Sequence, residues 1–256
     1  MIYFTYMLLF LQKKIDPVRW KTMACYKYKE NTSEYPNSYM IPKYRDKSKN
    51  QKEYVEALYD PTIDLLFCIG PAGTGKTLFA CMYGIEQMKQ KNIEKIVITR
   101  PTISIEENMG FLPGDIKHKM YPWTLPIFDI FREYYHNKEI DTMIRENKIE
   151  IAPLGFMQGR TFKNALIIAD EMQNSTPLQM FMLLTRIGTQ SKIVVTGDCM
   201  QTHQKQNGLE DILYKLTQTY PLSNTMYKDH MQIVEMTQKD IQRHPIVETI
   251  TNLYIK

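Results

Sequence analysis

One stretch of the sequence has the residue types and the spacing needed to bind phosphate groups. A glycine, four further residues and then Gly-Lys-Thr occupy positions 70–77. In such a loop the backbone N–H groups converge on the phosphates, the lysine reaches the β- and γ-phosphates, and the threonine hydroxyl binds Mg²⁺. The residues of this predicted phosphate-binding loop are Gly70, Pro71, Ala72, Gly73, Thr74, Gly75, Lys76 and Thr77.

The residues on either side predict the strand and the helix that this loop requires. Residues 65–69 form a short apolar run that is typical of a buried parallel strand. Residues 78–89 contain good helix formers, with apolar side chains on a helical period. The helix N-terminus then adds its partial positive charge to the loop. A flexible glycine-rich turn with a chance lysine would not need these two flanking elements.

A second group of chemical interest follows another apolar run. Residues 165–169 predict a fully buried strand that ends in Asp170 and Glu171. Ligands bind at the carboxyl edge of a parallel sheet, so this pair is expected beside the phosphates. Asp170 is a candidate to hold Mg²⁺, usually through a water molecule, and Glu171 is a candidate general base for an attacking water. The alternative is a solvated acidic turn.

The rest of the pattern alternates strands and helices. Strands are predicted over 93–99, 148–152, 192–196 and 232–237, and helices over 51–59, 208–219 and 238–254. A further helix is predicted after Asn174, with Thr176 as its N-cap, Pro177 in its first turn and Gln179 completing a capping box. Gln201, on the polar tip after the 192–196 strand, is a candidate sensor of the γ-phosphate.

The distribution of charge separates the first 50 residues from the rest of the chain. Residues 1–50 contain 10 Lys or Arg against 4 Asp or Glu, whereas residues 51–256 contain 22 against 24. The nearly neutral second part gives little support for tight binding of nucleic acid through bulk charge. We expect residues 1–45 to be an N-terminal extension or linker, in part disordered or a docked helix, and residues 46–256 to be the nucleotide-binding domain.

The basic segment leaves two questions open. The apolar residues 1–11 are too few to span a bilayer and lack the flanks of a signal peptide, so they predict a docked helix or leader codons before a start at Met23. Residues 26–50 predict a solvated linker, although the interleaved Tyr and Lys would also suit stacking on single-stranded nucleic acid.

The cysteines and histidines predict neither a disulfide framework nor a zinc site. Four separate cysteines, with no CxxC pair, are typical of a reducing cytosol, and the histidines lack metal-ligand spacing. Cys68 and Cys81, which flank the phosphate-binding loop, are expected to be small core residues. We therefore predict a cytoplasmic protein without a membrane or zinc partner.

Eight ordered motifs resemble those of the PhoH-like ATPases and cover roughly residues 51–256. They are the glycine loop, Thr-Arg-Pro, Gly-Phe-Leu-Pro-Gly-Asp, Gly-Arg-Thr, Asp-Glu-Met-Gln-Asn, Thr-Arg-Ile-Gly, Gly-Asp-x-x-Gln and Asp-x-x-Arg-His-Pro. The resemblance implies an α/β fold, namely a three-layer αβα RecA-like P-loop NTPase with a mainly parallel central sheet. It also implies ATP and Mg²⁺ as ligands and the roles given above for Lys76, Thr77, Asp170, Glu171 and Gln201.

The resemblance further suggests that Gln51 reads the adenine, as a glutamine does in related helicases, and that the chain assembles into a homo-hexameric ring. The sequence departs from the family pattern at Cys199, at Thr202-His203, at Gln158 and in a shorter 203–207 loop. These departures leave ATP binding untouched and put the coupling to any nucleic acid in doubt.

Three functions remain open at this point. The presence of both carboxylates favours an ATPase that transfers the γ-phosphoryl group to water. An ATP-binding switch with negligible turnover and a translocase on single-stranded RNA or DNA are the alternatives, and a single RecA-like core would translocate only as an oligomer. A further cation is expected to stabilise the transition state. The candidates are Arg100, Arg160, Arg186 and Arg243, and the motif around Arg243 favours this last one as a catalytic residue.

Overall fold

The computed structural model describes residues 42–101, 116–200, 207–219, 226–227 and 230–242. The chain divides into two units, residues 1–35 and 36–256, and every described residue belongs to the second unit. None of the helices in these described ranges has the length and the apolar character needed to cross a membrane.

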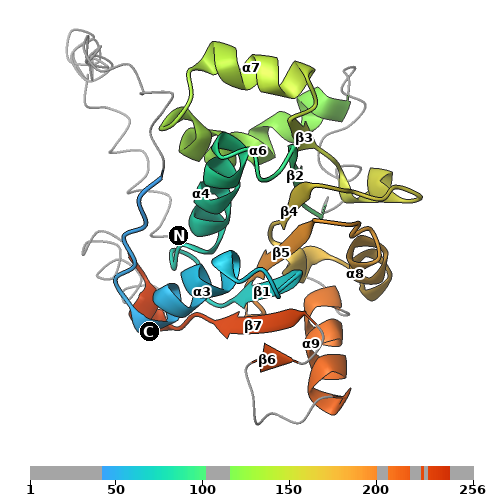
Figure 1. Cartoon of the computed structure of the whole chain (residues 1–256). Helices are drawn as coiled ribbons and strands as arrows, with labels where there is room; N and C mark the ends of the chain where they lie inside the picture. The colour runs from blue at the N-terminus through green and yellow to red at the C-terminus, as the bar shows by residue number, and fades with distance from the viewer. Residues whose placement is uncertain (1–41, 102–115, 201–206, 220–225, 228–229, 243–256) are drawn as a thin grey trace, which may run out of the picture. The chain divides into compact units, whose positions relative to one another are not determined.

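A sheet of seven strands in the order β3-β2-β4-β5-β1-β7-β6 forms the centre of the described part (Figure 1). The strands from β3 to β7 in this order pair in parallel, and only β6 is antiparallel to its neighbour. The strands are β1 (Leu65–Ile69), β2 (Lys95–Thr99), β3 (Ile149–Ile151), β4 (Ala165–Ala169), β5 (Lys192–Gly197), β6 (Met226–Tyr227) and β7 (Met231–Glu235). Because the six strands are parallel, their carboxyl ends lie at one edge of the sheet.

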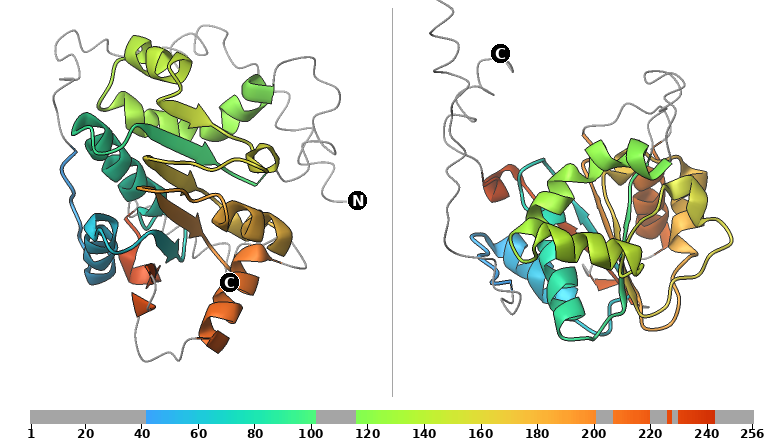
Figure 2. Two further views of the ribbon diagram at one scale, coloured as in Figure 1. Left: turned by 45° about the vertical axis from the view of Figure 1, so that its right-hand side comes forward. Right: turned by 90° about the horizontal axis from the view of Figure 1, so that it is seen from above.

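Helices cover both faces of the sheet, which gives the predicted three-layer α/β architecture (Figures 1 and 2). One face carries α3 (Lys49–Tyr59), α4 (Lys76–Lys89), α6 (Ile116–Arg132) and α7 (Asn137–Arg145). The other face carries α8 (Pro177–Leu184) and α9 (Gly208–Thr219), together with the 3₁₀ turn η1 (Leu154–Met157).

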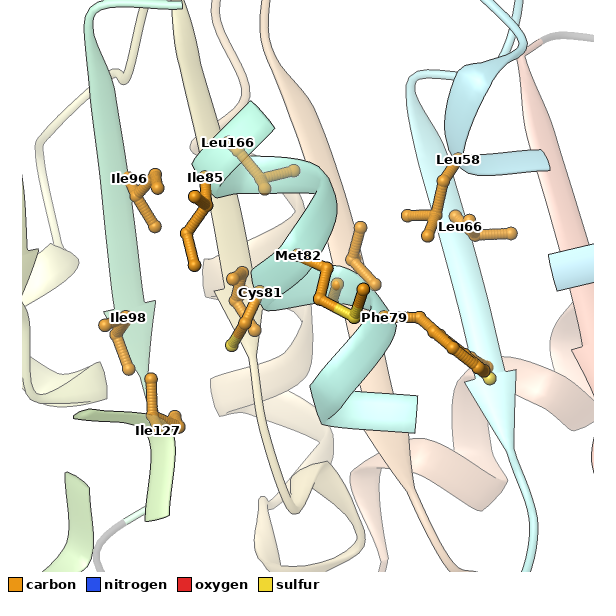
Figure 3. Close-up of a cluster of buried hydrophobic side chains, with 14 of the residues drawn as sticks. Leu58, Leu66, Phe79, Cys81, Met82, Ile85, Ile96, Ile98, Ile127 and Leu166 are labelled. Atoms are coloured by element: carbon orange, nitrogen blue, oxygen red, sulfur yellow. The ribbon is translucent and has the colours of Figure 1, made fainter. Parts of the chain in front are cut away.

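The core on the first face is built around α4 (Figure 3). Cys81 and Ile85 of α4 are fully buried against residues of β2 and β4 such as Ile96 and Leu166. Gly84 lets the helix approach the sheet closely, because a Cβ there would lie 2.8 Å from Leu166 Cδ2. Burial of each large side chain in such a core contributes about 1.5–3 kcal/mol. This packing fixes the start of α4, and hence the phosphate-binding loop, relative to the strand ends.

Alternate residues of the same strands form a second core on the opposite face. In β1, for example, Leu66 and Cys68 belong to the α4 side, whereas Phe67 belongs to the side of α8 and α9. In β4 all five residues are buried, as expected for a strand covered on both faces. The two cores hold β1, β4 and β5 as one rigid unit.

Most of the elements predicted from the sequence are confirmed. The strands at 65–69 and 165–169 have the predicted bounds, and the Thr176–Gln179 capping box of α8 is present. The helix predicted over 238–254 is wrong at its start, because residues 238–240 form a 3₁₀ turn, η3 (Gln238–Asp240), and Ile241 is extended. Residues 243–254 of that helix lie outside the described residues. Strand β6, which has only two residues, was not predicted from the sequence.

A lysine links β5 to the C-terminal end of α3. Lys192 Nζ donates to the carbonyl oxygens of Ala57, Leu58 and Asp60 at 3.2, 2.7 and 2.9 Å. Burial lowers the pKa of Lys192 to about 8, so the ammonium group still carries its three N–H donors at neutral pH. A cation at this position also complements the negative end of the helix dipole.

We expect Lys192→Met to lower the free energy of unfolding by about 1–3 kcal/mol, because it removes three hydrogen bonds from partly buried carbonyls. The matched control is Lys215→Met, which removes an exposed pair with Asp211 and should cost about 0.5 kcal/mol or less. Urea unfolding of both variants checks the difference. Equal losses in the two variants would contradict the role given to Lys192.

Candidate functional site

The phosphate-binding loop connects β1 to α4 and needs its glycines for physical reasons. Gly70, Gly73 and Gly75 have φ values of 135°, 84° and 90°, which disfavour any residue with a side chain. Gly70 also packs so closely on the end of β7 that a Cβ would lie 2.2 Å from the carbonyl oxygen of Met236. Gly75 is the N-cap of α4, so the loop leads directly into the helix N-terminus.

Lys76 lies across this loop. Its Nζ donates to the carbonyl oxygens of Gly70 and Pro71 at 2.7 and 2.8 Å. Burial lowers the pKa of Lys76, although the nearby carboxylates of Asp198, Glu171 and Asp170 partly oppose this effect. A cation that is held in a polar loop and surrounded by little water interacts strongly with an anionic ligand.

Asp170 joins the start of α4 to the ends of β4 and β5. Its Oδ1 accepts hydrogen bonds from Thr77 Oγ1 at 2.7 Å and from Thr196 Oγ1 at 2.6 Å. The carboxyl group is buried, and its backbone N–H is bonded to Thr99 of β2. A carboxylate and a hydroxyl in contact form the oxygen donor set that Mg²⁺ prefers. These residues therefore fit the ion that the sequence predicts.

Glu171 has an unusual backbone conformation at the end of β4. Its φ and ψ are 55° and 40°, in the left-handed region, which costs a residue of this type about 1–2 kcal/mol. Gln173 Nε2 donates to Glu171 Oε2 at 2.5 Å, and a guanidinium nitrogen of Arg100 lies 3.6 Å from Oε1. Backbone strain of this kind occurs where function requires a particular side-chain position.

The candidate arginines have different surroundings. Arg160 pairs with Glu150 at 2.5 Å and stacks on the ring of Phe162. Arg186 donates to the carbonyl oxygens of Met182 and Arg160. Both side chains therefore hold the described structure together, whereas Arg100 lies beside Glu171. Arg243 and Gln201 lie outside the described residues, so their roles stay predictions.

Gln51 is close to the loop and is buried. Its Nε2 donates to the carbonyl oxygens of Thr74 and Asp240, at 3.1 Å each, and its Oε1 accepts from the backbone N–H of Lys47 at 2.8 Å. To read an adenine, the carboxamide would have to exchange some of these bonds. This role of Gln51 also stays a prediction.

A turn after β7 contacts the phosphate-binding loop. The Oδ2 atom of Asp240 accepts from Asn50 Nδ2 at 2.8 Å and from the backbone N–H of Thr237 at 2.6 Å. Two residues later, Gln242 N–H donates to the carbonyl oxygen of Gly73 at 2.9 Å. Burial by itself would raise the pKa of Asp240, but hydrogen bonds, from Ser48 first, outweigh it and lower the pKa.

Most of the chain matches one protein-family model. The family model described as PhoH-like protein matches residues 43–255. The chain belongs to the PhoH-like family. It is 37% identical over 215 residues to a PhoH-like protein of Synechocystis, which covers 82% of this chain and 62% of that protein. It is 39% identical over 214 residues to a PhoH-like protein of Bacillus subtilis, which covers 83% of this chain and 64% of that protein.

This PhoH-like chain spans less than two thirds of the length of these two relatives. Protein PhoH of Escherichia coli K12 is 37% identical over 178 residues, or 65% of this chain and 48% of that protein. Among solved structures, the Pif1 helicase of Candida albicans matches with a TM-score of 0.37 and 15% identity, over 84% of this chain and 44% of that chain.

Three polar residues of the site were missed by the sequence analysis. Thr196 contacts Asp170, and Gln173 contacts Glu171. Asp240 closes the turn after β7, from which Gln242 N–H bonds to Gly73 of the loop. Each belongs to a stretch that was recognised, namely the polar tip of β5, the Asp-Glu-Met-Gln-Asn motif and the Asp-x-x-Arg-His-Pro motif. The motifs mark these positions, but only the fold shows which partner each side chain has.

We expect Asp240→Ala to lower the free energy of unfolding by about 2–3 kcal/mol at pH 7, because the donors of Asn50 and Thr237 lose a buried acceptor. Since the pKa of Asp240 is lowered from 3.8 in the folded state, this stabilisation is present above pH 3.8 and is lost as the pH falls through the folded pKa. Urea unfolding at pH 7 and at about pH 3 checks both statements.

The matched control is Asp211→Ala, because Asp211 makes an exposed pair with Lys215 on α9. It should cost about 1 kcal/mol or less at pH 7. A cost for Asp240→Ala that equals this control, or that stays constant with pH, would contradict the role of Asp240.

Proposed function

We propose that this PhoH-like protein is a Mg²⁺-dependent ATPase that transfers the γ-phosphoryl group of ATP to water. One observation carries the proposal: the hydroxyl of Thr77 and the carboxylate of Asp170 are 2.7 Å apart at the end of the phosphate-binding loop. ATP binding is implied by the family, and the adjacent Glu171 supplies the group that hydrolysis needs beyond binding.

The positions of the residues support the following roles. Lys76 exchanges the carbonyls of Gly70 and Pro71 for the β- and γ-phosphates, and the loop N–H groups bind the remaining phosphate oxygens. Thr77 and Asp170 would hold Mg²⁺, which would neutralise charge on the phosphates. Glu171 accepts a proton from water while the water oxygen bonds to the γ-phosphorus. The bond from that phosphorus to the bridging oxygen breaks, and ADP and phosphate leave.

Several further parts of the proposal rest on the family resemblance and on the sequence. Gln51 is proposed to bind the adenine, Gln201 to sense the γ-phosphate and Arg243 to complete the site, within its own subunit or across an interface. We also propose a homo-hexameric ring, a cytoplasmic location and coupling to single-stranded RNA or DNA. Phosphate release measured with and without RNA or DNA tests the coupling, and the mass of the same protein in solution tests the assembly.

Lys76→Ala should weaken triphosphate binding and abolish turnover, because the phosphates lose their fixed cation. The measurements are the affinity for a fluorescent ATP analogue and the steady-state release of phosphate. Lys52→Ala is the control, since Lys52 makes an exposed pair with Glu56 on α3. Hydrolysis at the wild-type rate by the Lys76 variant would refute the proposal. Tight ATP binding with no phosphate release by the wild type would favour the switch.

Glu171→Gln should keep ATP and Mg²⁺ bound and cut turnover by roughly 10²–10⁴, the usual contribution of a general base. Asp170→Asn provides the comparison, because it should weaken the effect of Mg²⁺ on nucleotide affinity as well as turnover. Titration of the ATP analogue with and without Mg²⁺ separates the two variants. If Glu171→Gln loses binding and turnover to the same extent, Glu171 holds structure or metal instead.

A further inference from the structure

One buried carboxamide connects the candidate general base to the neighbouring strand. Gln173 Nε2 donates to Glu171 Oε2 at 2.5 Å, and Gln173 Oε1 accepts from the backbone N–H of Asp198 at 3.1 Å. Asp198 directly follows β5, so a single side chain joins the ends of β4 and β5. Gln173 is 2% exposed and its bond with Asp198 is buried, so little water competes for that bond.

The surrounding backbone holds this carboxamide in place. Gln173 is the middle residue of the 3₁₀ turn η2 (Met172–Asn174), which is closed by a bond from Asn174 N–H to the carbonyl oxygen of Glu171. Gly197 provides the space, because a Cβ there would lie 2.9 Å from Gln173 Oε1. A residue with a side chain at position 197 would therefore have to displace the glutamine.

The two partners of the Glu171 carboxylate differ in kind. The bond from Gln173 is short and partly buried, whereas the Arg100 guanidinium lies 3.6 Å from Oε1, beyond hydrogen-bond distance. The Glu171 side chain is 38% exposed. The amide therefore fixes Oε2 and leaves Oε1 as the oxygen that can meet a water molecule. A neutral donor achieves this orientation without adding a charge to the site.

We propose that Gln173 is a positioning residue that orients the Glu171 carboxylate toward the attacking water. Through Gln173, this orientation also depends on the position of the end of β5. This inference rests on the proposed ATPase function. Three residues after Asp198 comes Gln201, the predicted sensor of the γ-phosphate. A shift of the β5 end on nucleotide binding would move the Asp198 N–H and, through Gln173, the Glu171 carboxylate.

Two substitutions test the proposal. Gln173→Met has a similar length but no donor, and it should lower the rate of hydrolysis about 10- to 100-fold, because misplacement by about 1 Å costs a catalytic group that much. The affinity for nucleotide should stay within about twofold, since the two carboxamide bonds that the substitution changes join Glu171 and Asp198, which are not residues of the phosphate-binding loop. Gln173→Glu keeps the acceptor for Asp198 but places a second carboxylate beside Glu171.

The pH profile gives a readout that a purely structural role would not change. In Gln173→Glu the two neighbouring carboxylates cannot both ionise easily, so the acid limb of the kcat profile should move up by about one pH unit or more. Gln179→Met is the matched control, because Gln179 caps α8 through Thr176 and lies outside the site. It should lower thermal stability slightly and leave the pH profile unchanged.

A double-mutant cycle identifies the partner through which Gln173 acts. In a Glu171→Gln background the Gln173→Met substitution should cost no further single-turnover rate, because the group that it positions is already absent. Equal losses in both backgrounds would overturn the proposal, and so would a loss of nucleotide affinity by the folded variant that matches its loss of rate. Should Gln173→Met not fold, the pH profile of the isosteric Gln173→Glu decides.

The ATPase function and the role of Gln173 can be refuted separately. If the wild type releases no phosphate, the ATPase function is refuted and the role of Gln173 falls with it. If the wild type is active, Glu171→Gln is inactive and both Gln173 variants keep the wild-type rate and pH profile, the role of Gln173 alone is refuted.

Discussion

A single carboxylate oxygen holds the candidate site together. Asp170 Oδ1 accepts from Thr77 at the start of α4 and from Thr196 near the end of β5. Because parallel strands bring their carboxyl ends to one edge, side chains far apart in the sequence can meet at this oxygen. The remaining parts of the site are arranged around it: the loop precedes Thr77, Glu171 follows Asp170, and Asp198 comes two residues after Thr196.

The two apolar cores make this arrangement rigid enough to include strain. Every residue of β4 is buried, and α4 packs on β2 and β4 through Cys81, Gly84 and Ile85. Cys68 and Cys81 are fully buried in the first core, which confirms that they are small core residues, and this burial raises the pKa of both thiols. A scaffold that is fixed on both sides can hold Glu171 in a left-handed conformation that an isolated turn would relax.

The parts of the fold that could be predicted are those with a local signal. The runs at 65–69 and 165–169 are bounded by polar or glycine residues, and the structure places β1 and β4 at those residues. The start of the last predicted helix was wrong because Asp240 bonds back to Thr237 and closes a turn instead of beginning a helix. The carboxamide bridge of Gln173 could not be predicted either, since it depends on the absence of a side chain at Gly197, on a different strand.

The carboxylates of Asp170 and Glu171 are adjacent in the sequence but have different surroundings. Two neighbouring carboxylates that share one environment would raise each other's proton affinity. The left-handed turn at Glu171 gives the two groups different partners: two threonine hydroxyls for Asp170, and the Gln173 amide with the more distant Arg100 for Glu171. With these partners, the Asp170 carboxylate is suited to a metal ion and the Glu171 carboxylate to a proton. The strain at Glu171 thus separates two functions that the sequence places side by side.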